Sequence, residues 1–170
     1  MTVFIALLRA VNVGGTGKLS MTELKKLCEE AGFTEVKTYI ASGNVLFKSD
    51  QSEAQVKAAL EKKLHVYAGK PVGVMVRTAA EMGKVLEKNA FPEMPGNRTV
   101  AIFLDEKPAA KTLEGITGQA DEKVALGKRE VYVYYGSGMA DTKLKIPGAK
   151  DGTARNMNTV AKLVELAKAL

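Results

Sequence analysis

The sequence predicts an α+β fold of two closely packed ferredoxin-like halves of the βαββαβ type, each with an antiparallel sheet. Three observations predict it. Short runs of β-branched and aromatic residues are typical of strands, three Ser or Thr capping boxes precede apolar residues at helical spacing, and Gly or Asn turns separate the runs. We expect the first half to span residues 1–77 and the second half to span residues 78–170.

The first half begins with a strand over residues 3–8 that is apolar at every position, which is typical of a strand buried on both faces. A glycine-rich loop follows, and then a helix that starts at the capping box Ser20–Glu23 and ends at Gly32. The remaining elements are a hairpin over residues 36–47, a helix from the capping box at Ser52 to Leu64, and a strand over residues 72–77.

The second half has a similar order without a residue-level repeat. A third capping box, Thr78–Glu81, starts a helix that ends near Asn89, and a proline-containing break follows at residues 91–97. The elements expected after the break are a strand over 99–104, a short helix over 108–116, a hairpin over 124–135 and a final helix whose N-cap is Thr153 or Asn156. The second half is therefore predicted to be α-β-α-β-β-α.

Composition excludes several classes of protein. The chain has 170 residues and a net charge of +6. Its single cysteine, Cys28, excludes an intrachain disulfide and a Cys-rich zinc site, and its single histidine, His65, excludes two-histidine metal motifs. No apolar run approaches the length of a membrane span, and no basic leader precedes the first apolar run. We expect a cytoplasmic protein without a metal, a cofactor or a membrane partner.

A junction between strand and helix carries the first candidate site. Arg9 ends the first strand, Asn12, Gly14 and Gly15 lie in the loop, and Lys18 precedes the helix. Backbone N–H groups of such loops and the helix N-terminus behind them favour anions. The glycine spacing fits neither the Walker phosphate loop nor the dinucleotide fingerprint. The alternative, to which we give equal weight, is that the loop forms a tight turn and binds no ligand.

The start of the last helix is the second candidate site. A cation at Arg155, beside the first turn, opposes the helix dipole, and an anion nearby would relieve that conflict. The anion is either a bound phosphate or carboxylate or the side chain of a neighbouring Asp or Glu.

The hairpin turn is the third candidate. Ser42 and Asn44 can hydrogen-bond a ligand at the sheet end, or they can simply form a turn with Asn44 in the left-handed conformation.

Three segments resemble one family in order and spacing. They are residues 4–15, 38–45 and 153–160, and the family is the domain-of-unknown-function family numbered 1697. The resemblance covers essentially the whole chain and implies two α+β halves of ferredoxin-like character, with no established activity. It implies shared polar positions at Arg9, Asn12, Lys18, Ser42, Asn44, Asn89, Arg155, Asn156 and Thr159. The chain departs from the family pattern at Met157, where relatives have Trp, and at Ala90, where they have Pro.

These observations favour a small anionic ligand that bears phosphate or carboxylate groups and is nucleotide-like. It would bind at the glycine-rich loop and at the Arg155–Asn156 helix start, with Arg9 and Arg155 holding the negative groups. We expect Asn12, Asn44 and Asn156 to orient the ligand. No catalytic motif is recognised, so enzyme activity is left open.

Two alternatives belong to other classes of function. Tyr132 and Tyr134 share a strand face and can stack bases or pack between sheets, so a weak nucleic-acid-binding plait is one alternative. The positive charge is spread without a basic block, which gives this reading little support. The other alternative is an interaction or dimerisation module without a small ligand, because each first strand is apolar on both faces. The chain is expected to be a monomer or a homodimer.

Overall fold

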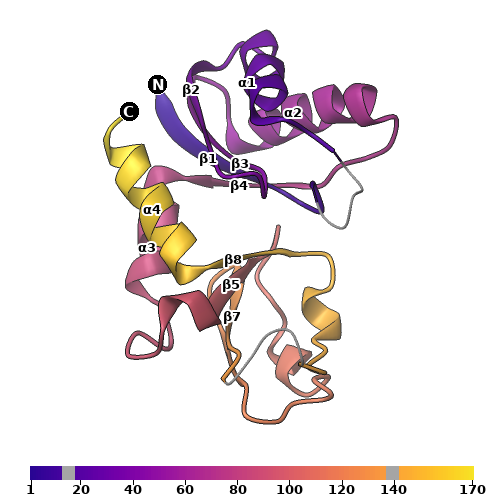
Figure 1. Cartoon of the computed structure of the whole chain (residues 1–170), viewed down its shortest axis with the longest axis vertical. Helices are drawn as coiled ribbons and strands as arrows, with labels where there is room; N and C mark the ends of the chain where they lie inside the picture. Colours follow the sequence, from indigo (N-terminus) through magenta and orange to yellow (C-terminus); the bar gives the residue numbers. More distant parts are fainter. Residues whose placement is uncertain (13–17, 137–141) are drawn as a thin grey trace. The chain divides into compact units, whose positions relative to one another are not determined.

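The computed structural model describes residues 1–12, 18–136 and 142–170 (Figure 1). It confirms the α+β class, with two four-stranded antiparallel sheets. The chain divides into two compact units, residues 1–82 with 163–170 and residues 83–162. The predicted boundary at residue 77 precedes α3 (Ala79–Glu87), whereas the units divide within this helix and within α4 (Met157–Lys168).

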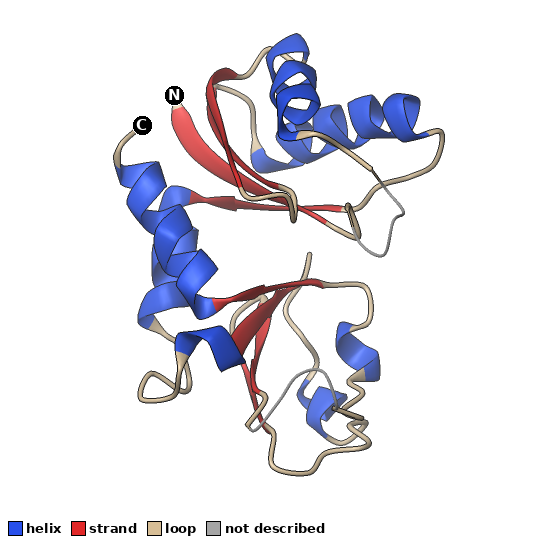
Figure 2. Ribbon diagram, viewed as in Figure 1, coloured by secondary structure: helices blue, strands red, loops and turns tan. Residues whose placement is uncertain are grey.

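The first unit has the strand order β2-β3-β1-β4, which is the order of a ferredoxin-like plait. Helices α1 and α2 cover one face of this sheet (Figures 1 and 2). Its elements are β1 (Thr2–Leu8), α1 (Met21–Glu30), β2 (Thr34–Tyr39), β3 (Asn44–Ser49), α2 (Glu53–Ala68) and β4 (Val74–Thr78).

The predicted helix caps of this unit are present. Ser52 and Gln55 form both hydrogen bonds of a capping box at α2, and the Ser20 hydroxyl accepts a hydrogen bond from the Glu23 N–H at α1. Gly32, just beyond α1, adopts the left-handed conformation expected of a helix end, with a φ of 93°. Local sequence signals therefore set these helix ends.

The core of the first unit lies between its sheet and its two helices. Alternate residues of β1 and β3 meet the apolar stripes of α1 and α2, and the Phe33 and Phe47 rings stack with their centroids 4.2 Å apart. Ile5 and Leu7, on the opposite face of β1, are also fully buried, so β1 is buried on both faces as predicted.

Cys28 of α1 belongs to this core and is 0% exposed. Burial raises the pKa of its thiol from 9.0 to about 12, with a smaller contribution from Glu29. The unfolded chain therefore loses the thiol proton at a lower pH than the folded chain. We expect the stability that the thiol contributes to be complete below its unfolded pKa and to be lost as the pH rises from 9.0 toward 12.

Urea unfolding at about pH 8 and at about pH 10.5 measures this loss, and Cys28→Ala provides the matched variant. The drop in unfolding free energy between the two pH values should be smaller in the variant than in the parent chain. An equal drop in both proteins would show that ionisation of the Cys28 thiol does not cause the loss of stability.

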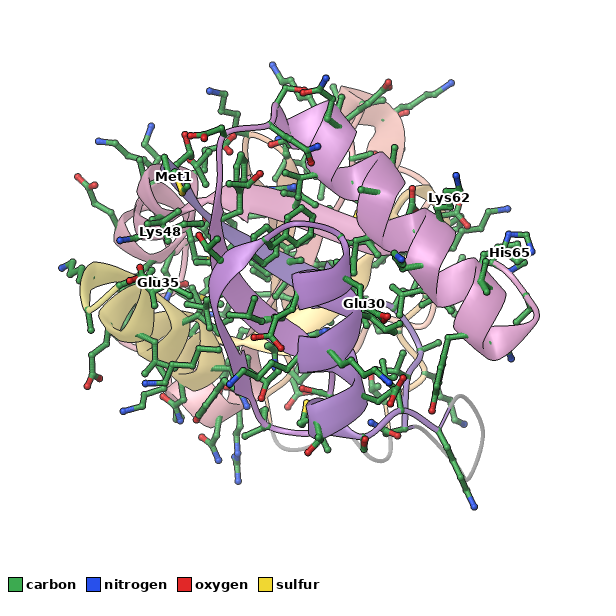
Figure 3. The ribbon with its side chains drawn as sticks, turned by 90° about the horizontal axis from the view of Figure 1, so that it is seen from above. Met1, Glu30, Glu35, Lys48, Lys62 and His65 are labelled. Atoms are coloured by element: carbon green, nitrogen blue, oxygen red, sulfur yellow. The ribbon has the colours of Figure 1, made fainter. Side chains whose placement is uncertain are left out.

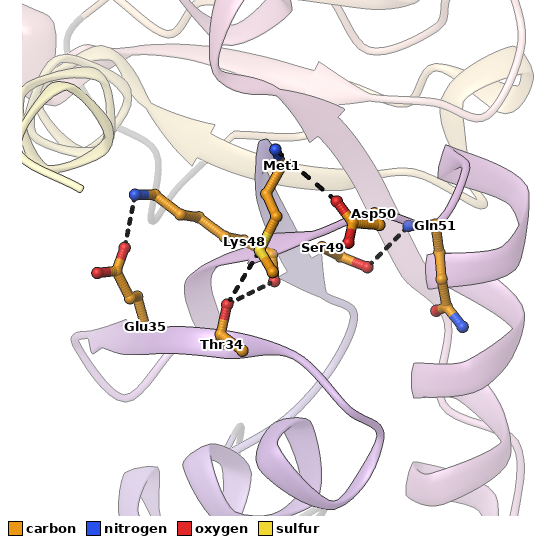
Figure 4. Close-up of polar contacts among 7 residues, drawn as sticks. All are labelled: Met1, Thr34, Glu35, Lys48, Ser49, Asp50 and Gln51. Carbon is orange, nitrogen blue, oxygen red and sulfur yellow. Dashed lines mark hydrogen bonds and ion pairs between the residues drawn. The ribbon is translucent and has the colours of Figure 1, made fainter.

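The end of the first sheet near residue 49 is held by polar contacts, drawn in Figure 4. The pairing of β2 with β3 shifts between Thr34 and Lys37, and Glu35 lies within this bulge with a φ of 51°. The Glu35 carboxylate forms an ion pair of 2.7 Å with the Lys48 ammonium group. This end is opposite to the sheet end at which β1 meets the glycine-rich loop, so it does not contribute to the candidate site.

The second unit repeats the strand order of the first as β6-β7-β5-β8. Short 3₁₀ helices stand in the places that α1 and α2 occupy in the first unit. Its elements after α3 are η1 (Gly96–Arg98), β5 (Thr99–Phe103), η2 (Ala110–Leu113), β6 (Lys123–Leu126), β7 (Glu130–Tyr134), η3 (Pro147–Ala149), β8 (Thr153–Asn156) and α4 (Met157–Lys168).

Two predictions for this unit were wrong in detail. The helix expected over residues 108–116 is the 3₁₀ helix η2, of only four residues. Thr153, one of the two N-caps expected for the last helix, instead begins the edge strand β8, in which Ala154 pairs with Ile102 of β5. Four residues are too few to show the alternation of a strand in sequence, and pairing with a longer strand decides their conformation.

Candidate functional site

The chain turns sharply where β1 ends. The Arg9 N–H donates to the Gly73 carbonyl over 2.9 Å, which fixes Arg9 beside the segment that leads into β4. Ala10 and Asn12 both have left-handed backbones, with φ of 57° and 54°. Asn adopts this conformation readily, whereas Ala pays a steric cost of about 1 kcal/mol or more. The turn thus holds strain at the sheet end.

The Asn12 side chain holds this turn in place. Its Nδ2 donates to the carbonyls of Leu19 over 2.8 Å and Ala41 over 2.7 Å. Its Oδ1 accepts from the Leu19 N–H over 2.8 Å. These three bonds join the end of β1 to the start of α1 and to the β2–β3 hairpin, so the carboxamide that we expected to orient a ligand also closes the loop.

We expect Asn12→Ala to lower the free energy of unfolding by about 2 kcal/mol, because it removes three hydrogen bonds and leaves a residue that disfavours positive φ. Asn12→Gly removes the same bonds without the φ penalty, so it should cost about 1 kcal/mol less than the alanine variant. Urea unfolding measures both. An alanine variant as stable as the parent chain would contradict the closing role of the carboxamide.

The β2–β3 turn packs directly against the end of β1. The Leu8 N–H donates to the Gly43 carbonyl over 2.8 Å, and the Asn44 Nδ2 donates to the Tyr39 carbonyl and to the Ser42 hydroxyl. Asn44 is fully buried. The positive φ angles of the turn lie at Ile40 and Gly43, so the alternative with Asn44 in the left-handed conformation is wrong.

A pocket of about 770 Å³ lies at the turn that follows β1, within the first unit. Arg9, Lys18 and Lys70 supply three cationic side chains to its lining, and no Asp or Glu is among the lining residues that the structure describes. The other lining residues are Ala10, Val11, Leu19, Leu64, Tyr67, Ala68, Pro71, Val72 and Gly73. Three like charges around one hollow produce a positive potential that attracts small anions.

Lys70 was missed by the sequence reasoning. It follows Gly69, the left-handed C-cap of α2, whose N–H donates to the His65 carbonyl. The reversal at Gly69 turns the chain from α2 toward Gly73 and so brings Lys70 to the pocket that Arg9 lines. No local motif marks a lysine in this position. The glycine that ends the helix is the available signal, and it predicts a change of direction rather than a site.

Gly14 and Gly15, which were predicted to bind the anion, lie outside the residues that the structure describes. Ser42 and Asn44 lie in the adjoining hairpin turn and are not among the pocket-lining residues. Of the predicted site residues in the first unit, the pocket therefore brings together Arg9 and Lys18.

The remaining predicted residues belong to the second unit. Arg155 lies in β8, one residue before the helix cap, and its Nη1 donates to the Thr153 hydroxyl over 2.7 Å and the Ala154 carbonyl over 2.9 Å. Burial lowers the pKa of its guanidinium to about 10. Asn156 is the cap of α4, because its Oδ1 accepts from the Thr159 N–H over 2.9 Å, so the alternative cap Thr153 was wrong.

Arg77 is a further buried arginine that the sequence reasoning missed. Arg77 pairs with Ile5 of the central strand β1, as Arg155 pairs with Ala101 of the central strand β5. Both precede a helix cap, and the Arg77 Nη1 donates to the Val76 carbonyl just as that of Arg155 donates to Ala154. An Arg followed by a capping residue at the end of each fourth strand is the signal that was overlooked.

One family model matches most of the chain. A model described as protein of unknown function, DUF1697, matches residues 1–132. The chain belongs to this family. Among solved structures, it is similar to the conserved bacterial protein SP0830 from Streptococcus pneumoniae, with 27% identity, a TM-score of 0.82 and 99% of each chain covered. No curated protein was found to match the chain.

The matched range of this DUF1697 member includes the segments 4–15 and 38–45, whereas the segment 153–160 lies beyond it. Met157, where a Trp was expected from the family pattern, is 4% exposed and therefore fills space in the interior. The Asn89 Oδ1 accepts from the Phe91 N–H over 3.0 Å, which gives Asn89 a local role in the turn after α3.

Residues 1–12, 18–136 and 142–170 contain no cluster of three or more His, Cys, Asp or Glu that could hold a metal ion. None of the helices in those ranges is long and apolar enough to cross a membrane.

Proposed function

We propose that this protein binds a small anionic ligand, bearing phosphate or carboxylate groups and nucleotide-like, in the pocket lined by Arg9, Lys18 and Lys70. The observation that carries the proposal is the concentration of three cations, without a lining carboxylate, in one pocket of about 770 Å³. Pockets for small ligands commonly have volumes of about 300–1,000 Å³. The expected cytoplasmic location belongs to the same proposal and rests on composition.

The electrostatics favour an external anion over an internal one. Neither Lys18 nor Lys70 forms an ion pair with another residue in the described part of the chain. Both ammonium groups are therefore available to a ligand, and a dianion would reduce the mutual repulsion of the lining cations. The planar guanidinium of Arg9 adds bidentate geometry suited to carboxylate and phosphate.

The start of α4 remains a predicted second contact. Thr153 and Ala154 accept hydrogen bonds from the Arg155 guanidinium, and Asn156 caps the helix. These contacts support a structural role for both residues. We therefore base the proposed binding site on the pocket of the first unit.

No described contact favours the nucleic-acid alternative. Tyr132 is buried, and its hydroxyl donates to the Val85 carbonyl over 2.8 Å, so its ring offers no face to a base. Burial also raises the pKa of this hydroxyl. The nucleic-acid and dimerisation alternatives stay predictions.

We expect inorganic pyrophosphate to raise the melting temperature of the protein in a saturable manner. A ligand that binds the folded chain but not the unfolded chain stabilises the folded state. Lys18→Ala and Lys70→Ala should each weaken the apparent affinity by about tenfold, since each removes one charged donor. Lys26→Ala is the matched control: Lys26 is exposed on α1 and is not a lining residue. An apparent affinity that is unchanged in both pocket variants, or no rise with pyrophosphate, phosphate or citrate, would refute the proposal.

A further inference from the structure

The cationic pocket has an apolar wall. Five of its lining residues, Leu64, Tyr67, Ala68, Pro71 and Val72, come from the end of α2 and from the segment that leads to β4. Tyr67 is 46% exposed, whereas Leu64 is 1% exposed and belongs to the core. Tyr67 is thus the lining residue that offers a large apolar surface to a molecule in the pocket.

Few large apolar side chains are this exposed in the protein. The described ones are Met1, Ile40, Val66, Tyr67 and Leu113. Of these, Tyr67 alone lines the pocket with the three cations. Among these exposed residues, Tyr67 is the one aromatic side chain, and it shares a pocket lining with Arg9 and Lys70.

Tyr67 also lines a second hollow, of about 460 Å³, between α1 and α2. Leu27, Ala31, Ala59 and Val66 give that hollow an apolar lining, and Glu30, Lys62 and Lys63 complete it. Figure 3 looks onto this side of the unit and labels Glu30, Lys62 and His65. Because Tyr67 lines both hollows and is 46% exposed, part of its side chain is accessible to a ligand.

We propose that Tyr67 stacks on the aromatic ring of the bound ligand, so that the ligand is a nucleoside phosphate. Arg9, Lys18 and Lys70 hold its phosphate, and the wall of Tyr67 and Pro71 receives its base. The inference rests on the proposed anion site and adds the part of the ligand that the cations do not recognise. A volume of about 770 Å³ is far more than a single phosphate group fills.

Aromatic stacking favours a base over a sugar or an aliphatic group. Every base has a flat π-face, and stacking on a protein aromatic ring is worth enough to change affinity about five- to 150-fold. Hydrogen-bond donors and acceptors that would select one base are few in the described lining, since its uncharged side chains other than Tyr67 are aliphatic. We therefore expect little discrimination between adenine and guanine.

Calorimetric titration of the protein with adenosine 5′-monophosphate, ribose 5-phosphate and inorganic phosphate separates the contribution of the base from that of the phosphate. We expect the nucleotide to bind at least about fivefold more tightly than ribose 5-phosphate, which has the phosphate and sugar without the base. Tyr67→Leu should abolish this preference and leave the affinity for ribose 5-phosphate unchanged. Tyr67→Phe should retain the preference, because it keeps the ring.

Val66→Ala is the matched control, since Val66 is the adjacent exposed residue and lines the second hollow but not the pocket. It should leave both affinities unchanged. Equal binding of nucleotide and sugar phosphate, or a preference that survives in Tyr67→Leu, would overturn the stacking inference while leaving the anion site intact. Failure of all three compounds to bind would overturn the anion site, and the inference with it.

Discussion

Gly43→Ala should lower the free energy of unfolding by about 3 kcal/mol, because two penalties add at this position. The backbone of Gly43 has a φ of 88°, which residues with a Cβ rarely adopt. A Cβ at this position would lie 2.6 Å from the Val11 Cγ2 and 2.9 Å from the Leu8 Cβ. The Leu8 Cβ is attached directly to the backbone, and Val11 is a buried β-branched residue with little rotamer freedom, so the turn itself must move.

Gly32→Ala is the matched control, because it has the penalty of a positive φ without the steric clash. Gly32 has a similar φ of 93°, but no atom lies within 4 Å of the Cβ position. It should cost about 1 kcal/mol, and urea unfolding of both variants measures the difference. Equal losses in the two variants would show that the close approach of the hairpin turn to Leu8 and Val11 contributes nothing to stability.

Phe47→Ala should be the most destabilising of the substitutions considered, with a loss of about 3–5 kcal/mol. Phe47 is 0% exposed at the centre of the first unit. Its ring stacks on Phe33 with an interplanar angle of 6° and lies against Phe4 with the centroids 6.1 Å apart. Alanine leaves a cavity that these two rings and the backbone of β3 cannot fill without moving.

Phe47→Leu keeps most of the volume and should cost about half as much as alanine. Thermal and urea unfolding, followed by circular dichroism, compare the two variants with the parent chain. A loss below about 1 kcal/mol for Phe47→Ala would contradict the packing described for this core.

The first unit was predictable because local signals and long-range packing agree there. The capping residue Ser52, the left-handed glycine at Gly32 and the apolar run in β1 each indicate the element that forms. The hairpin is also where it was expected, although its positive φ angles fall at Ile40 and Gly43 rather than at Asn44. The type of turn depends on how the hairpin packs against Leu8, which the sequence of the turn does not reveal.

The second unit was less predictable because its elements are short. β8 has four residues, and its conformation is decided by pairing with β5 rather than by its own pattern. The 3₁₀ helix η2 likewise replaces a predicted helix. The same strand order in both units nevertheless shows that a sheet can keep its topology when short 3₁₀ helices stand in the places of the α-helices between its strands.

The candidate site was predicted in part. Arg9 and Lys18 flank one loop in the sequence, so their common location could be inferred from a single junction. Lys70 and Tyr67 reach the same pocket from the far end of α2, and only the folded chain reveals that placement. Asn12 was recognised as important, but its three hydrogen bonds show that its contacts are to the chain itself.

The central claim is that the pocket of Arg9, Lys18 and Lys70 binds an anion. Nuclear magnetic resonance titration of the ¹⁵N-labelled protein with pyrophosphate tests it most directly. We expect saturable shifts of the amide signals of Arg9, Lys18, Lys70 and Gly73, and their loss in the double variant Lys18→Ala/Lys70→Ala. Shifts that do not saturate, that persist in the double variant, or that gather on residues outside the pocket would contradict the claim.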